Sequence, residues 1–200
     1  MAYGFPSLEP AFTARLHPAE GFQIGKSTVN PFPEVDIYSL SGNVSDGGSL
    51  NIVPIASGTL ISEPGFSVPL DAEIVYGSDY VRMEPSQGHT RINVNAILKY
   101  VSCQSCAQAV SNSFNRNRDG SFLTYSYTGI VEVDEAFLAI LTANPNAKTT
   151  AYGNAFSHVT FKTGSESLRK LDHSLFIGSA HFVVENGGFY IETKVSRVIG

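Results

Sequence analysis

Two cysteines and five histidines are the residues of this chain that most often act as nucleophiles, metal ligands or acid–base groups. Cys103 and Cys106 form a single C-x-x-C motif. A four-thiolate metal site needs a second such pair, and thioredoxin-like chemistry needs a surrounding βαβ pattern. The motif therefore predicts two free thiols or a local disulfide within the polar connection 102–121, and a catalytic thiol is a less favoured alternative.

The histidines lack the spacing of a metal pair, and the sequence predicts no metal site. His158 and His173 are the groups best placed for proton transfer near neutral pH, although a lone histidine more often has a structural role. The segment Asp172-His173-Ser174 does not predict a hydrolase triad, because neighbouring residues of a strand point to opposite faces. No phosphate- or dinucleotide-binding glycine motif is present, and no cofactor is expected. The histidines are His17, His89, His158, His173 and His181.

The composition indicates one mildly acidic domain. The chain has 200 residues, 18 acidic and 13 basic side chains, and a formal net charge of −5. A domain of this size can bury a substantial core, and the absence of basic clusters disfavours nucleic acid as a partner.

No apolar run is long enough to span a membrane. A cytoplasmic location is favoured, and secretion stays open if an N-terminal segment has been removed. A homo-oligomer also stays open.

Alternating apolar residues separated by turn residues predict an all-β protein of about ten strands, either a sandwich or a closed barrel. Turns are expected at 45–48, 63–65, 76–79, 119–120 and 186–188, and Asn186-Gly187 is the strongest hairpin signal. The expected strands are 12–17, 36–40, 51–61, 67–76, 80–84, 90–101, 122–132, 155–163, 175–185 and 188–198.

One segment has the pattern of a helix. Asp134 can cap its N-terminus, an acidic first turn and apolar residues follow, and Pro145 stands just beyond its end. A second helical turn is expected at 165–171, and segment 26–35, with Pro31 and Pro33, is expected to form an irregular arm.

Aromatic, amide and imidazole side chains recur on one side of consecutive strands. They can be solvated outer positions, since polar side chains are mostly exposed. Alternatively, they can line the lumen of a barrel that holds a ligand. The residues concerned are Asn93, Asn95, Tyr125, Tyr127, Phe156 and His158.

The C-terminal half carries a resemblance. The segment 171–180, LDHSLFIGSA, and the preceding Phe161-Lys-Thr-Gly164 resemble the closing signature of a bacterial and fungal family of small β-barrels of unknown function. Segments Ile52-Val-Pro-Ile-Ala-Ser-Gly-Thr59 and Gly77-Ser-Asp-Tyr80 are also similar to segments of that family. The resemblance covers about 51–198.

The resemblance implies one domain over residues 1–200, an antiparallel lipocalin-like barrel with one short helix. Residues 1–50 would add N-terminal strands and an extended arm to the family-like barrel at 51–198. Asp79 matches an acidic residue of the family, whereas Asn93 and Tyr127 stand where Asp and Arg are usual, and Asp172 where Asn is usual. The loss of charge at 93 and 127 favours a less polar ligand.

The longer chain is also similar to fungal barrel proteins of secondary metabolism, which include the hetero-Diels–Alder enzymes of tropolone–sesquiterpenoid pathways. This implies a cofactor-independent cyclase acting on a hydrophobic, oxygenated small molecule in the lumen. The alternative is a non-catalytic carrier or a plugged barrel. The expected proton donors are His158, Tyr127 and Lys99, and the expected substrate-binding residues are Asn93, Asn95, Tyr125, Phe156, Phe161, Asp79 and Tyr80.

Overall fold

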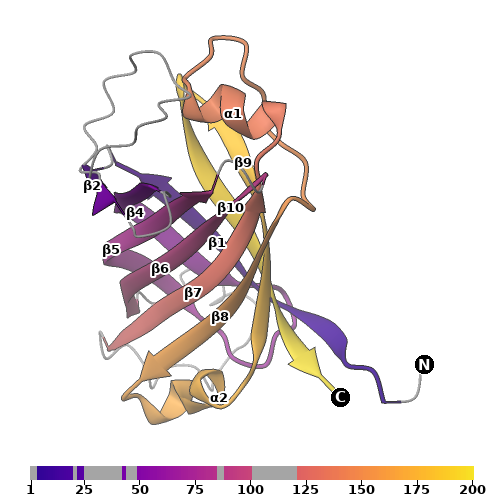
Figure 1. Ribbon diagram of the computed structural model, residues 1–200. Coiled ribbons are helices and arrows are strands. Elements are labelled where there is room, and N and C mark those ends of the chain that lie inside the picture. Colours follow the sequence, from indigo (N-terminus) through magenta and orange to yellow (C-terminus); the bar gives the residue numbers. More distant parts are fainter. Residues whose placement is uncertain (1–3, 20–21, 25–41, 44–48, 85–87, 101–120) are drawn as a thin grey trace.

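Ten strands and two helices make up the described part of the chain (Figure 1). The computed structural model describes residues 4–19, 22–24, 42–43, 49–84, 88–100 and 121–200. The strands are β1 (Ser7–Pro18), β2 (Phe22–Ile24), β3 (Gly42–Asn43), β4 (Ser49–Ser62), β5 (Asp71–Glu84), β6 (His89–Tyr100), β7 (Phe122–Glu132), β8 (Ala155–Thr163), β9 (Phe176–Glu185) and β10 (Gly188–Ile199).

Eight of these strands close into an antiparallel barrel. From β4 to β10 each long strand pairs with the next, and β1 closes the ring because it pairs with β10 on one edge and with β4 on the other. Short strands β2 and β3 pair with the first residues of β4. The predicted fold class is confirmed, but eight strands rather than ten form the barrel.

Strand β5 differs from the sequence prediction. Residues 76–79 were expected to form a turn between two strands, and instead they belong to one continuous strand with a bulge between Ile74 and Tyr76. Gly77 serves packing here, because a Cβ at this position would meet Ile55 Cδ1 at 2.9 Å and Ala96 Cβ at 3.1 Å. The hairpin at Asn186 and Gly187 is confirmed, with φ angles of 52° and 79°.

The two predicted helical segments are confirmed. Helix α1 (Glu135–Leu141) begins after Asp134, whose carboxylate accepts the backbone N–H of Phe137 at 2.7 Å. A 3₁₀ turn (Glu166–Leu168) leads into α2 (Arg169–Asp172). Figure 1 shows α1 at the upper end of the barrel and α2 at the lower end. Neither helix of the described residues is long and apolar enough to cross a membrane.

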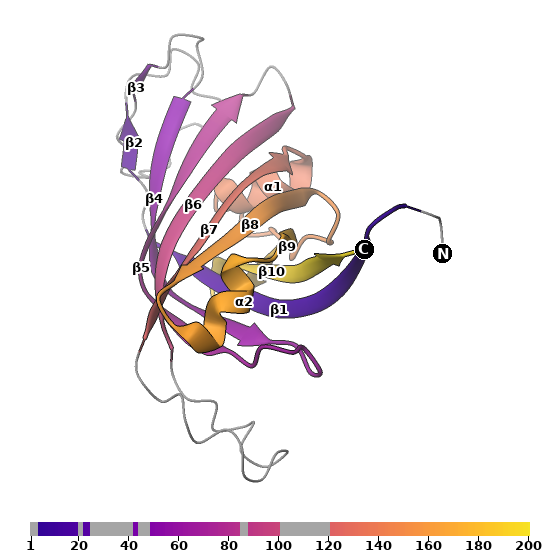
Figure 2. The same cartoon turned by 90° about the horizontal axis from the view of Figure 1, so that it is seen from below.

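A packed aromatic core fills the lower end of the barrel. Phe12, Phe161 and Phe176 are fully buried, and their ring centroids lie 5.1–5.9 Å apart. Phe66, from the connection between β4 and β5, packs edge-on against Phe12. Leu168 and Leu171 join this cluster from the helical turns that pass beneath it (Figure 2). The lower end is therefore closed by apolar side chains.

A second apolar cluster lies at the upper end. Phe137 and Ile140 of α1 pack with Val131, Ala155 and Phe182, which come from β7, β8 and β9. Helix α1 therefore covers the upper end over these three strands.

Several features expected from the sequence lie outside the described residues, namely the strand 36–40, the arm 26–35, the turns 45–48 and 119–120, and the motif Cys103–Cys106.

Candidate functional site: the upper interior of the barrel

The strand register aligns one row of inward-facing residues across the wall. Val53 of β4 pairs with Asp79 of β5, Asp79 pairs with Val94 of β6, and Val94 pairs with Tyr127 of β7. Tyr127 in turn pairs with Val159 of β8. Since directly paired residues share a face of the sheet, all five point into the barrel. The row thus places one carboxylate and one phenol among valines.

The inner wall is partly accessible on β4, β5 and β6 at and just above the level of Asp79, whereas Thr90, higher on β6, is fully buried. Leu98, low on β6, is fully buried, whereas Ile92, higher on the same face, is partly exposed. Val53 and Asp79 are likewise partly exposed. On the opposite side the corresponding Ser157 of β8 is buried. Solvent therefore reaches this part of the inner wall at Val53, Asp79 and Ile92.

Asp79 is the acidic group of this wall. Its Oδ1 accepts a hydrogen bond from the backbone N–H of Asn93 at 3.2 Å. Burial raises the pKa of the Asp79 carboxyl to about 7, although the Asn93 N–H favours the charged form. A carboxyl with this pKa is present in both protonation states near neutral pH, and can therefore donate or accept a proton.

Two tyrosines of β7 face the same space. Tyr125 and Tyr127 are buried, and their rings pack edge to face with centroids 5.4 Å apart. Burial raises the pKa of both phenols, and the charge of Asp79 raises that of Tyr127 further. Both therefore stay protonated and can act as hydrogen-bond donors. The Tyr125 hydroxyl has no hydrogen-bond partner in the protein.

The structure brings together four of the ten residues predicted for the site. These four point into the barrel: Asp79, Tyr125, Tyr127 and Phe161. The other six lie on the outer face and are exposed, which corrects their expected place at the site; Phe156 and Phe161 lie on opposite faces, as simple alternation predicts. The six outer residues are His158, Lys99, Asn93, Asn95, Phe156 and Tyr80.

The register explains this division. His158 pairs with Thr128, and Thr128 pairs with Asn93, so these three side chains share the outer face. Alternation alone gives two faces per strand without saying which is inside. The inner face is the one that supplies a continuous apolar core, and on β8 that face carries Val159 and Phe161. Asp79 was found through its resemblance to a family position, because the local sequence Gly77-Ser78-Asp79 otherwise indicates a turn.

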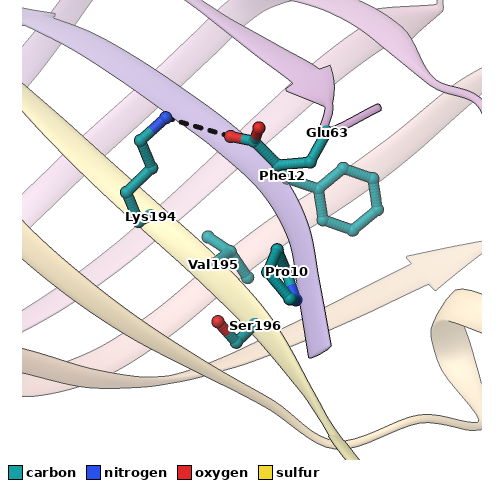
Figure 3. Close-up of a pocket in the computed structure, with 6 residues that line it drawn as sticks. All are labelled: Pro10, Phe12, Glu63, Lys194, Val195 and Ser196. Atoms are coloured by element: carbon teal, nitrogen blue, oxygen red, sulfur yellow. Dashed lines mark hydrogen bonds and ion pairs between the residues drawn. The ribbon is translucent and has the colours of Figure 1, made fainter. Parts of the chain in front are cut away.

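A surface pocket lies away from this interior, between the start of β1 and the end of β10 (Figure 3). Pro10, Val195 and Ser196 form part of its wall, and the ammonium of Lys194 donates to Glu63 Oε1 at 3.0 Å. The two charges of the pocket therefore neutralise each other. The pocket contains no further ionisable group among the described residues, and it offers less chemistry than the barrel interior.

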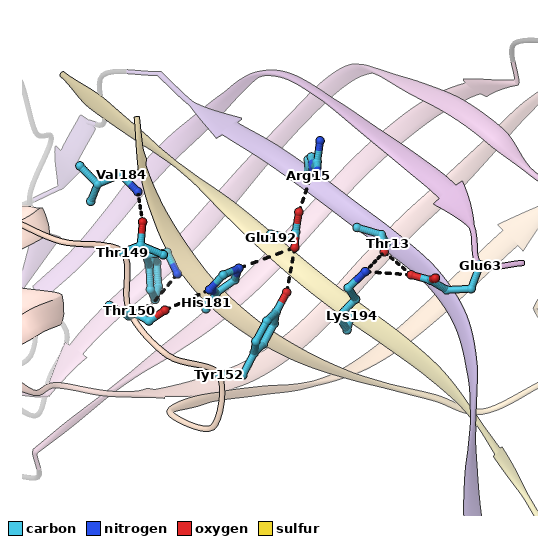
Figure 4. A network of polar contacts seen from close by, with 11 residues as sticks. Thr13, Arg15, Glu63, Thr149, Thr150, Tyr152, His181, Val184, Glu192 and Lys194 are labelled. Carbon is cyan, nitrogen blue, oxygen red and sulfur yellow. Dashed lines mark hydrogen bonds and ion pairs between the residues drawn. The ribbon is translucent and has the colours of Figure 1, made fainter. Parts of the chain in front are cut away.

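A polar network on the outer wall fastens the connection between α1 and β8 (Figure 4). Glu192 of β10 accepts Arg15 Nε at 2.8 Å and the Tyr152 hydroxyl at 2.9 Å. The Tyr152 ring stacks on His181 with centroids 4.0 Å apart. Thr150 accepts hydrogen bonds from the His181 ring and from the backbone N–H of Phe182, and its own backbone N–H donates to the Phe182 carbonyl. These contacts hold a connection in place and do not face the interior.

No group of three or more His, Cys, Asp or Glu side chains that could hold a metal ion occurs in the part of the chain that the structure describes. Asp79 stands without a second carboxylate in its row. The ionisable groups at the level of this row are thus one carboxyl and one phenol, with the Tyr125 phenol one row below. Buried hydroxyls of Thr90, Ser157 and Thr193 also face the interior.

A protein family of unknown function, DUF3237, matches this chain over residues 6–198. The chain belongs to this family. The match begins before β1, so the first strand of the barrel is part of the family's unit. No curated protein matches the chain.

Solved structures share the fold at low sequence identity. A β-barrel-like protein from Acinetobacter baumannii is 17% identical, with a TM-score of 0.60 and coverage of 98% of this chain and 97% of the other. A protein of unknown function from Clostridium acetobutylicum is 14% identical, with a TM-score of 0.61 and 98% of both chains covered. An enzyme from Penicillium herquei is 13% identical, with a TM-score of 0.52, and the match covers 97% of this chain and 95% of that enzyme. The likeness shows the barrel fold.

Proposed function

We propose that the upper interior of the barrel binds a hydrophobic, oxygenated small molecule and promotes its cyclisation without a cofactor, as in a hetero-Diels–Alder cycloaddition. The observation that carries the proposal is Asp79, a carboxyl that faces the interior with a pKa near 7 and shares a row with Tyr127. A fungal barrel of the same fold is described as an enzyme, which supports a catalytic role for this architecture.

The residues of the row would divide the work as follows. Apolar side chains such as Val53, Val94 and Val159 hold the substrate in a folded shape and exclude water. Holding two reacting π-systems together contributes much of the rate enhancement, since well-oriented intramolecular reactions reach effective molarities of about 10⁵–10⁸ M. Tyr127 donates a hydrogen bond to a carbonyl oxygen and polarises it.

Asp79 would act where a reactive diene must first form by loss of water. The protonated carboxyl gives its proton to a leaving hydroxyl, and water departs. The carboxylate then takes a phenolic proton from the same substrate, which leaves a neutral quinone methide and the carboxyl in its starting state. In the following cycloaddition, two σ bonds form from two π bonds, and no oxidant or reductant is needed. One titrating group is sufficient for this sequence.

The test compares an interior variant with an outer-wall variant. Small molecules that co-purify with the wild-type protein are identified by mass spectrometry, and the recovered ligand is incubated with each variant. Cyclisation gives a product of equal mass, or lighter by one water, with a new retention time. We expect Asp79→Asn and Tyr127→Phe to lower the rate at least tenfold, and the exposed His158→Ala to leave it unchanged. A ligand returned unaltered by the wild type would favour a carrier, and equal rates in all variants would contradict the proposed roles.

A further inference from the structure

The carboxyl of Asp79 faces the barrel interior without a cation opposite it in the described residues. Val53 faces it from β4, Val94 from β6 and Tyr127 from β7, and Tyr127 is the titratable group among them. Its strand neighbours Tyr80 and Arg82 point to the outer face by alternation. A negative charge on Asp79 is therefore not balanced by a positive charge from these strands.

An inward-facing cation, Arg197, lies at the lower end of the described barrel, where its strand position pairs with Phe176. Arg197 forms an ion pair with Glu9 at 2.7 Å, and its guanidinium lies 5.5 Å from the centroid of the Phe66 ring. Glu9 already neutralises this cation. The described interior thus contains no positive charge that could receive a carboxylate, phosphate or sulfonate of a ligand.

A second observation concerns the hydroxyl of Tyr125. The side chain is fully buried one row below Asp79 and Tyr127, with its ring between those of Tyr127 and Phe161 at 5.4 and 5.6 Å. The hydroxyl has no partner in the protein. Buried hydroxyls are normally paired, because an unmade hydrogen bond costs about 1–3 kcal/mol. The hydroxyl is therefore a buried donor that no described protein group uses.

We propose that the occupant of the interior is an uncharged molecule whose hydroxyl or carbonyl oxygen binds the Tyr125 hydroxyl, and that Asp79 excludes anionic molecules. This inference rests on the proposed function, since it concerns the same site. The Asp79 carboxylate would attract an amine, but an ammonium removed from water needs several acceptors, and only Tyr127 adds an oxygen in this row.

The experiment uses four probes that share the naphthalene ring system and differ in polarity and charge: naphthalene, 2-acetylnaphthalene, 2-naphthoate and 2-naphthylmethylamine. Dissociation constants are measured by calorimetry or fluorescence at about pH 8.5 and about pH 5.5, with the wild-type protein and with Asp79→Asn and Tyr125→Phe. At the higher pH we expect naphthoate to bind at least tenfold more weakly than the ketone, because two like charges a few ångströms apart repel strongly in a partly desolvated site. The amine should not exceed the ketone.

The variants separate the two elements of the proposal. At the lower pH, where Asp79 is protonated and naphthoate is still ionised, the difference between naphthoate and ketone should shrink to about threefold or less. Asp79→Asn should give this small difference at both pH values. Tyr125→Phe should weaken ketone binding about three- to tenfold, the worth of one hydrogen bond, and leave naphthalene unchanged.

The outcomes distinguish a failure of this inference from a failure of the proposed function. Tighter binding of naphthoate or of the amine than of the ketone at the higher pH overturns the charge selection, as does discrimination that survives in Asp79→Asn. Equal ketone affinity in Tyr125→Phe overturns the role of the hydroxyl. In these cases binding in the interior still stands. If none of the four probes binds, the proposed function itself fails, and this inference fails with it.

Discussion

The side chain of Asp79 on β5 is hydrogen-bonded to the main chain of Asn93 on β6, because Asp79 Oδ1 accepts the Asn93 backbone N–H at 3.2 Å. The Asp79 side chain points inward, whereas that of Asn93 points outward and is exposed. The carboxyl is therefore fixed to the adjacent strand by a bond that does not depend on the Asn93 side chain. A substitution of the Asn93 side chain should therefore leave the hydrogen bond that holds the Asp79 carboxyl in place.

Asp79 should lower the stability of the fold at neutral and higher pH. Its folded pKa of about 7 lies above the ordinary value of 3.8, so the folded state loses stability as pH rises from about 4 to 7 and then stays constant. Asp79→Asn retains the acceptor for Asn93 and removes the charge. We expect the free energy of unfolding of this variant, measured in urea, to exceed that of the wild type by about 2–4 kcal/mol at about pH 8 and to equal it near pH 4.

The exposed Glu166→Gln is the control for this titration, because the Glu166 side chain is 87% exposed. It should change stability by a few tenths of a kcal/mol at both pH values. An Asp79→Asn effect of equal size at pH 4 and pH 8 would mean that the charge is not its cause.

The Tyr125 hydroxyl should contribute nothing to folding. Tyr125→Phe removes a buried hydroxyl that has no partner, and we expect the free energy of unfolding to stay unchanged or to rise by about 1 kcal/mol. Tyr125→Ala removes the ring as well and should cost about 3–5 kcal/mol. Chemical denaturation of the two variants measures both effects, and a large loss in Tyr125→Phe would reveal an essential hydrogen bond.

Close packing at Gly178 should make it intolerant of a methyl group. A Cβ there would lie 2.5 Å from Ser157 Oγ and 2.9 Å from Thr193 Cγ2. We expect Gly178→Ala to lower the free energy of unfolding by about 1–3 kcal/mol, and Ser157→Ala to restore part of the loss. Gly164→Ala is the matched control, since no atom lies within 4 Å of its added Cβ. Equal stability of the two glycine variants would refute the steric explanation.

The network around Glu192 should stabilise the protein only above acidic pH. Burial opposes the charge of Glu192, but hydrogen bonds from Arg15 and Tyr152 outweigh it, and the pKa is lowered. Its contribution is therefore present above the ordinary pKa of 4.5 and is lost as pH falls through the lower folded value. A double-mutant cycle of Tyr152→Phe and Glu192→Gln should give a coupling of about 1 kcal/mol at pH 7, and a smaller coupling as the pH is lowered and Glu192 becomes protonated. A coupling independent of pH would contradict this linkage.

Sequence patterns predict the local structure of this barrel well. Alternation locates β6 to β10 within a few residues, and Asp134 and Asn186-Gly187 locate a helix start and a hairpin because their side chains or φ angles act locally. The turn expected at 76–79 fails for a long-range reason. Gly77 is small because Ile55 and Ala96 pack against it, which no local pattern contains.

The candidate site was harder to predict, because it depends on which face of each strand is inside. His158 and Tyr127 were expected together, but the pairing of Tyr127 with Val159 places His158 on the other side of the wall. A one-residue shift of register would exchange the two faces. Phenylalanines occur on both faces of β8, Phe156 outside and Phe161 inside, so an aromatic ring alone does not choose between the faces.

The closure of the barrel by β1 also bears on how the chain folds. Ser7 pairs with Ile199, so the two ends of the chain meet at one seam of the ring. Contacts between residues so distant in sequence form slowly, since the long intervening chain must be ordered first. Joining the ends with a short linker and opening the chain at the 186–187 turn would make this seam a local hairpin. The same change would place β9 and β10 at opposite ends of the chain, because a closed ring always keeps one such seam. The topology thus makes circular permutation a means of moving this long-range seam around the ring without altering the interior.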